Sequence, residues 1–192
     1  MRTDELLKHL TLLRGHDLLP LLMPTPAELL QVEVLELPTT HTTLDTILRL
    51  KSPLGQIYRH ILEWQGYPDP QVLWRLGGYQ AWVGRQAPHI HVLGTVIYLN
   101  SRSDMGDTLT QRIDGVDRQI WTFSCIRLWL LDAAEAVASG HLGQAILSPL
   151  MANPTDQQVT EVATTIIDRV QQPQQGDLLT ILGIFAETLV NW

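Results

Sequence analysis

The stretch from Leu44 to Gln65 constrains the fold most, because it contains two strand-like runs separated by a short turn. The runs are LDTILRLK (44–51) and QIYRHILE (56–63), and the segment SPLG (52–55) between them carries the Pro and Gly that favour tight turns. The pattern predicts an antiparallel hairpin, and with it a sheet in the N-terminal half of the chain.

Two carboxylates become neighbours in this hairpin. Pairing Lys51 with Gln56 and counting back places Asp45 opposite Leu62, and a slip of one residue places it opposite Glu63. Opposed like charges destabilise a sheet, by about 1 kcal/mol in water and about 3 kcal/mol at an effective dielectric of 20 for charges about 5 Å apart. A bound divalent cation would offset this repulsion.

Gln65 lies two residues beyond Glu63, so the strand period places both on one face. Mg²⁺ takes one or two carboxylates and completes its shell with water and substrate phosphate. We therefore predict a Mg²⁺ or Mn²⁺ site with Asp45 and Glu63 as ligands. The alternative is that the acids are solvated at strand ends and that Gln65 only begins the turn GYPDP.

The composition indicates a globular protein. The chain has 192 residues, of which 45% are apolar and 17% charged, and these values favour one domain over residues 1–192. The single cysteine, Cys125, excludes an internal disulfide framework and a Cys-rich zinc site. The charged N-terminus and a leucine run broken by prolines predict a cytoplasmic protein with no membrane segment.

The formal net charge of −7 argues against binding nucleic acid by bulk electrostatics. A local basic rim stays open as a prediction, because several cations lie before or within the hairpin. They are Lys8, Arg14, Arg49, Lys51 and Arg59. The alternative for each one is a solvated charge that balances nearby acids.

Periodicity predicts the order helix, strand, strand, strand, helix, strand. Around the hairpin strands, the predicted elements are a helix over 4–22 interrupted near Gly15, a strand over 31–37, a helix over 71–86 and a buried strand over 91–99. The second helix should bury Val72, Leu76, Tyr79 and Val83, with Asp69 as its cap. This order predicts an α/β protein with a mixed sheet.

The rest of the chain is predicted to support this core, which spans about residues 1–100. The segment 101–115 is polar and contains glycine, which indicates a loop. Beyond it, the supporting region from about residue 110 to 192 is predicted to hold a strand within 119–130 and helices over 132–139, 156–171 and 177–190. The last helix, which ends near Trp192, is a candidate homodimer interface.

The hairpin and its surroundings resemble the recombination-promoting nuclease and transposase family of the PD-(D/E)XK nuclease superfamily. The resemblance lies in LDTILRLKSPLGQIYRHILEWQGYPDP, RLGGYQ and VIYL, and extends to DELLKHL with HDLLPLLMP and to IRLWLLDAAEAVASG with SPLM. It covers most of the chain. It implies a restriction-endonuclease-like fold, whose core is helix, three strands, helix, strand, with additional C-terminal helices.

The resemblance also implies a Mg²⁺-dependent DNA endonuclease. Asp45, Glu63 and Gln65 fall on the motif positions as catalytic residues, and Arg75 and Gln80 match positions in the following helix that could reach substrate phosphate. Gln65 replaces the usual lysine, so the site loses a cation. Lys8 is the candidate substitute.

The loss of this lysine supports an alternative function. A glutamine can orient water or phosphate through its amide, but it cannot stabilise negative charge as a lysine does. The alternative is a catalytically weak or inactive superfamily member that serves as a nucleic-acid or protein interaction module.

Overall fold

The computed structural model describes residues 3–22, 26–33 and 46–190. The chain divides into two compact units: residues 27–126 form the sheet unit, and the residues before 27 and after 126 form the helical unit. Each unit is described separately.

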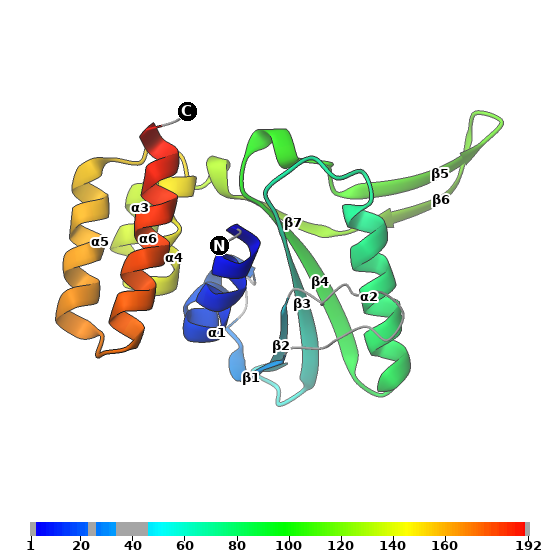
Figure 1. The fold of residues 1–192 in the computed structure, drawn as a ribbon. Coiled ribbons are helices and arrows are strands. Elements are labelled where there is room, and N and C mark those ends of the chain that lie inside the picture. Colours follow the sequence, from blue (N-terminus) through cyan, green and yellow to red (C-terminus); the bar gives the residue numbers. More distant parts are fainter. Residues whose placement is uncertain (1–2, 23–25, 34–45, 191–192) are drawn as a thin grey trace. The chain divides into compact units, whose positions relative to one another are not determined.

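The sheet unit contains a mixed sheet, which confirms the predicted α/β class (Figure 1). Among the described residues this sheet has five strands, which are, in spatial order, β1 (Glu28–Glu33), β2 (Thr46–Lys51), β3 (Ile57–Gln65), β4 (His91–Tyr98) and β7 (Ser124–Arg127). The pairs β1–β2 and β2–β3 are antiparallel, and β3–β4 is parallel. The connection between the parallel strands is the helix α2 (Val72–Gln86), as expected for a crossover.

Helix α2 packs on one face of β3 and β4. Its buried side chains include the predicted stripe of Val72, Leu76, Tyr79 and Val83. Gly94 of β4 lies directly beneath the helix, because a Cβ added there would stand 2.8 Å from Leu76 Cδ1. In the parallel register, Gly94 pairs with Ile61, so the odd-numbered residues of β3 lie on the same face as Gly94. Helix α2 therefore covers this face of β3.

We expect Gly94→Ala to destabilise the protein by about 1–3 kcal/mol, because the added methyl group overpacks the contact between α2 and β4. Gly78→Ala is the matched control within α2, since nothing lies within 4 Å of its added Cβ. It should be neutral or stabilising by up to about 1 kcal/mol through helix propensity. Urea unfolding of both variants measures the difference, and equal effects would contradict the close packing.

The opposite face of β3 carries a buried histidine. His60 Nε2 lies 2.8 Å from Thr95 Oγ1 of β4, and no hydrogen-bond partner of its Nδ1 is found in the described residues. Burial lowers the pKa of His60 to about 4 from its ordinary value of 6.5. The imidazole is therefore neutral in the folded protein at pH 7.

This depressed pKa predicts a loss of stability in mild acid. Above pH 6.5 the histidine is neutral in both states. As the pH falls from 6.5 to about 4, the unfolded state binds a proton that the folded state does not bind. The total loss should be about 3 kcal/mol. Urea unfolding at several pH values should show this loss in the wild type, and a smaller loss in His60→Gln, which does not titrate. Parallel pH profiles for the two proteins would disprove this account.

A second, two-stranded sheet replaces the loop predicted over 101–115. Strands β5 (Thr108–Ile113) and β6 (Val116–Thr122) form a hairpin (Figure 1), after the short 3-10 helix η1 (Ser101–Ser103). The two residues between these strands, Asp114 and Gly115, have positive φ values of 52° and 77°, as a tight two-residue turn requires. The loop prediction was wrong because it weighed polarity over this Asp-Gly turn signal.

The helical unit contains the first helix and the C-terminal helices. The helices are α1 (Thr3–Leu22), α3 (Ala133–Ala138), α4 (Leu142–Ile146), α5 (Asp156–Arg169) and α6 (Gln174–Val190), with 3-10 turns η2 (Leu128–Leu130) and η3 (Ser148–Leu150). Helix α1 kinks at Arg14, where φ is −138°, which confirms the predicted interruption near Gly15. None of the described helices is long and apolar enough to span a membrane.

Helices α1 and α4 pack closely through a glycine. A Cβ on Gly143 would lie 2.9 Å from the Cβ of Asp17, and the Gly143 amide donates a 3.1 Å hydrogen bond to the Asp17 carboxylate. The side-chain amide of Gln144 donates to the Asp17 carbonyl oxygen at 2.9 Å. The first bond satisfies one oxygen of a buried carboxylate, and the second satisfies a backbone carbonyl oxygen, both within the helical unit.

Candidate functional site

Glu63 and Gln65 lie at the C-terminal end of β3, on the face of the sheet that α2 covers. Both are buried, with 2% and 1% of their surface exposed. In the β2–β3 register, Lys51 pairs with Ile57 and Thr46 with Leu62, which corresponds to the predicted register slipped by one residue. Asp45, the other predicted metal ligand, lies outside the described residues.

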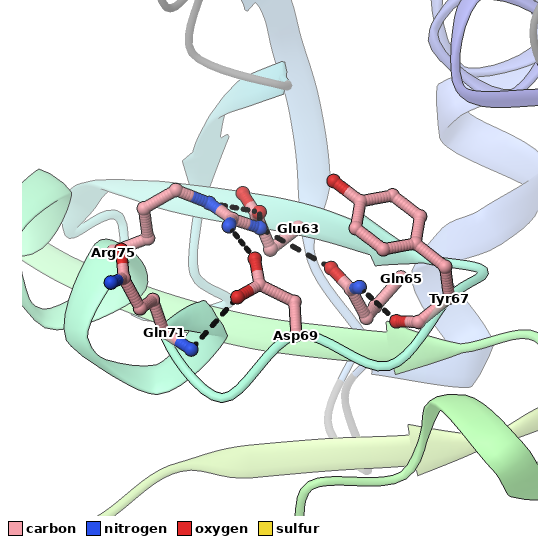
Figure 2. A network of polar contacts seen from close by, with 6 residues as sticks. All are labelled: Glu63, Gln65, Tyr67, Asp69, Gln71 and Arg75. Atoms are coloured by element: carbon pink, nitrogen blue, oxygen red, sulfur yellow. Dashed lines mark hydrogen bonds and ion pairs between the residues drawn. The ribbon is translucent and has the colours of Figure 1, made fainter.

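The guanidinium of Arg75 joins Glu63 to the beginning of α2 (Figure 2). Its Nε donates a 2.9 Å hydrogen bond to Glu63 Oε1, and its Nη2 donates to the same oxygen. Nη2 also donates to Gln65 Oε1 at 3.2 Å, and Nη1 donates to Asp69. One cation therefore contacts the side-chain oxygens of three residues: Glu63, Gln65 and Asp69.

Asp69 fixes the turn between β3 and α2. One carboxylate oxygen accepts the Gln71 backbone amide at 2.8 Å, and the other accepts from Arg75. Burial tends to raise the pKa of Asp69, but the hydrogen bonds from Gln71 and Arg75 and the charge of Arg75 hold it below its ordinary value. The helix begins at Val72, so Asp69 caps the turn that enters α2, close to the predicted capping role.

The electrostatics of the network favour a charged Arg75. Burial alone would lower the pKa of Arg75, yet the charges and hydrogen bonds of Glu63 and Asp69 outweigh burial and raise it. Two carboxylates share one guanidinium, so the three side chains together carry one negative charge. Both hydrogen bonds from Arg75 to Glu63 end on Oε1, so the guanidinium satisfies one of the two oxygens of this buried carboxylate.

Gln65 is oriented at both ends of its amide. Its Oε1 accepts from Arg75, and its Nε2 donates to the backbone carbonyl oxygen of Tyr67 (Figure 2). This pairing also brings a cation next to the position where the lysine of the nuclease motif is missing. The sequence analysis predicted that Arg75 could bind substrate phosphate. In the structure Arg75 also has a structural role, because it orients the amide of Gln65.

The remaining predicted residues are Gln80 and Lys8. Gln80 packs against Gly94, where its Cδ lies 3.0 Å from an added Cβ, and it makes none of the network's hydrogen bonds among the described residues. Lys8 lies in α1, in the helical unit. The sequence predicted Asp69 as a helix cap but not its contact with Arg75, six residues further along the chain.

Oxygen ligands are available at this site. Glu63 and Asp69 offer carboxylate oxygens and Gln65 an amide oxygen, the donor types that Mg²⁺ and Mn²⁺ prefer. Within residues 3–22, 26–33 and 46–190, no group of three or more His, Cys, Asp or Glu side chains could hold a metal ion. Mg²⁺ commonly takes only one or two carboxylates and completes its shell with water and substrate phosphate.

Comparisons with protein-family models, with curated proteins and with solved structures found no match to this chain. The resemblance to the nuclease family therefore stays a prediction from the residues.

Proposed function

We propose that the protein is a Mg²⁺- or Mn²⁺-dependent DNA endonuclease with a restriction-endonuclease-like core. The observation that carries the proposal is the convergence of two buried polar side chains, Glu63 and Gln65, beside the Arg75 guanidinium at the end of β3. Polar groups are buried in this way at considerable cost, so such a cluster is typical of a functional site. The order β1, β2, β3, α2, β4 also agrees with the core that the resemblance implies.

Each residue has a distinct role in this proposal. Glu63 would hold the metal ion together with Asp45. Gln65 would orient the attacking water or the scissile phosphate through its amide. Arg75 would place positive charge beside the developing oxyanion, in the role usually played by lysine. Charge neutralisation at the phosphate and activation of a water are the chemistry that the metal supplies when bound.

Calorimetric titration with Mg²⁺ and Mn²⁺ tests the site directly. The wild type should bind either ion, and Glu63→Gln should weaken the binding at least tenfold, because an amide is a poorer ligand for a hard cation than a carboxylate. Glu161→Gln, at an exposed position of α5, is the control for the lost charge and should bind as the wild type does. Equal binding by all three proteins would exclude Glu63 as a ligand.

The second candidate is an interaction module without catalytic activity. The specific observation that favours it is the ion pair between Arg75 and Glu63, because it neutralises the buried carboxylate with a protein cation at Oε1. A wild type that binds neither Mg²⁺ nor Mn²⁺ would favour this candidate over the endonuclease.

A further inference from the structure

A pair of arginines lies on the same face of the sheet as Glu63. Arg49 of β2 is directly opposite Arg59 of β3 in the antiparallel register. Arg59 and Glu63 are four residues apart on one strand, so their side chains point to one face. Gln31 of β1 faces Arg49 from its other side. This rung of the sheet thus places two arginines and a glutamine at neighbouring positions of three adjacent strands.

Like charges opposite one another destabilise a sheet unless something compensates them. Glu28 pairs with Lys51 at 3.0 Å, and Glu33 lies 3.1 Å from Arg59, so Glu33 offsets the charge of Arg59 but neither carboxylate is matched to Arg49. In the part of the chain that the structure describes, Arg49 has no carboxylate partner. Among the described residues, the positive charge of Arg49 on this face is therefore not balanced by a carboxylate.

The hydrogen bonding of Arg59 is incomplete as well. Its Nε is buried and, among the described residues, has no aligned hydrogen-bond acceptor, although the Glu33 carboxylate lies within ion-pair distance. The side chain is 21% exposed, so part of it is accessible from solvent. Nε faces Glu33, so an incoming anion would meet the part of the guanidinium that solvent reaches, where charge-assisted hydrogen bonds can form.

We propose that Arg49 and Arg59 form a binding subsite for a backbone phosphate of the nucleic acid. Guanidinium groups suit phosphate because their paired donors match its oxygens. Four residues of strand separate Arg59 from Glu63, which is about 13 Å at 3.3 Å per residue. A nucleic-acid strand carries one phosphate per about 3.4 Å of duplex axis. A strand bound at Glu63 can therefore present a second phosphate to this pair, a few nucleotides from the site of cleavage.

The choice of nucleic acid as the ligand rests on the proposed function, and the test separates the two. Binding of a short fluorescein-labelled DNA duplex is measured by fluorescence anisotropy in EDTA, so that no cleavage occurs. Arg49→Gln and Arg59→Gln should each reduce the slope of log K against log salt by about 0.9, equivalent to about eightfold weaker binding at 0.1 M salt. Arg112→Gln is the matched control, since Arg112 is paired with Asp117 in the β5–β6 hairpin.

Three outcomes decide the proposal. An unchanged salt slope in Arg49→Gln, or the same loss in Arg112→Gln, would overturn it. Displacement of the duplex by an equal concentration of inorganic phosphate would also overturn it, because the pair would then bind a free anion. A protein that binds DNA through Arg49 and Arg59 but does not nick it would support the subsite and refute the endonuclease. A protein that nicks DNA, and whose Arg49→Gln and Arg59→Gln variants bind DNA as the wild type does, would support the endonuclease and refute the subsite.

Discussion

Replacing Arg75 with methionine should lower the free energy of unfolding by about 3 kcal/mol. The substitution keeps much of the aliphatic volume but leaves Glu63, which is 2% exposed, without its cation. Breaking a buried ion pair from one side typically costs about 3–5 kcal/mol. The lower end applies because the Arg75 side chain is 26% exposed. Urea unfolding at pH 7 measures the loss.

The β5–β6 hairpin provides the control for this prediction. Arg112 forms a 2.6 Å ion pair with Asp117, but its side chain is 63% exposed. Exposed pairs contribute about 0–1 kcal/mol, so Arg112→Met should have little effect. If both variants lost the same stability, burial would not be what makes the Arg75 contact strong.

A second substitution should restore part of the lost stability. In the Arg75→Met background, Glu63→Gln removes the buried charge that has lost its partner, so the double variant should be more stable than Arg75→Met alone. The coupling energy between the two substitutions should exceed about 1 kcal/mol. Independent, additive effects would show that the guanidinium does not stabilise this carboxylate.

The sequence predicted the elements that carry long, regular hydrophobic patterns. The buried stripe from Val72 to Val83 predicted α2, and the apolar run from His91 predicted β4, because one face or both faces of these elements must be buried. The β5–β6 hairpin escaped prediction because most of its residues are exposed and show no such pattern. Its Asp114-Gly115 turn was the available signal.

The site was only partly predictable for a different reason. The period of a strand suffices to place Glu63 and Gln65 on one face. The contact between Arg75 and Asp69 depends on the path of the turn at 66–71, which no periodicity describes. The Arg49–Arg59 pair depends on the register, for which counting from the turn left two alternatives that differ by one residue. A shift of one residue moves every side chain to the other face, so such contacts require the structure.

Glu63→Gln should abolish Mg²⁺-dependent nicking of plasmid DNA while Gln65→Ala should only reduce it. Loss of a metal ligand removes charge neutralisation and activation of water together. Loss of one preorganised amide typically costs about 10²–10³ in rate, or about 3–4 kcal/mol. Glu63→Gln keeps an oxygen that can accept from Arg75, and Arg75 stays paired with Asp69, so the variant should still fold, although it loses the buried ion pair. Rates measured with Mg²⁺ and with Mn²⁺ compare the variants, and full activity in Glu63→Gln would refute the endonuclease proposal.

Adding the lysine of the nuclease motif should harm this protein unless Arg75 is changed as well. Arg75 Nη2 lies 3.2 Å from Gln65 Oε1, so in Gln65→Lys the new ammonium would lie beside a guanidinium. Two unit charges about 4 Å apart repel by about 4 kcal/mol at an effective dielectric of 20. The single variant should therefore lose stability and nicking activity. The double variant Gln65→Lys/Arg75→Gln should recover both, because one cation then remains beside Glu63. Higher nicking activity in Gln65→Lys alone would show that Arg75 does not occupy the place of the missing lysine.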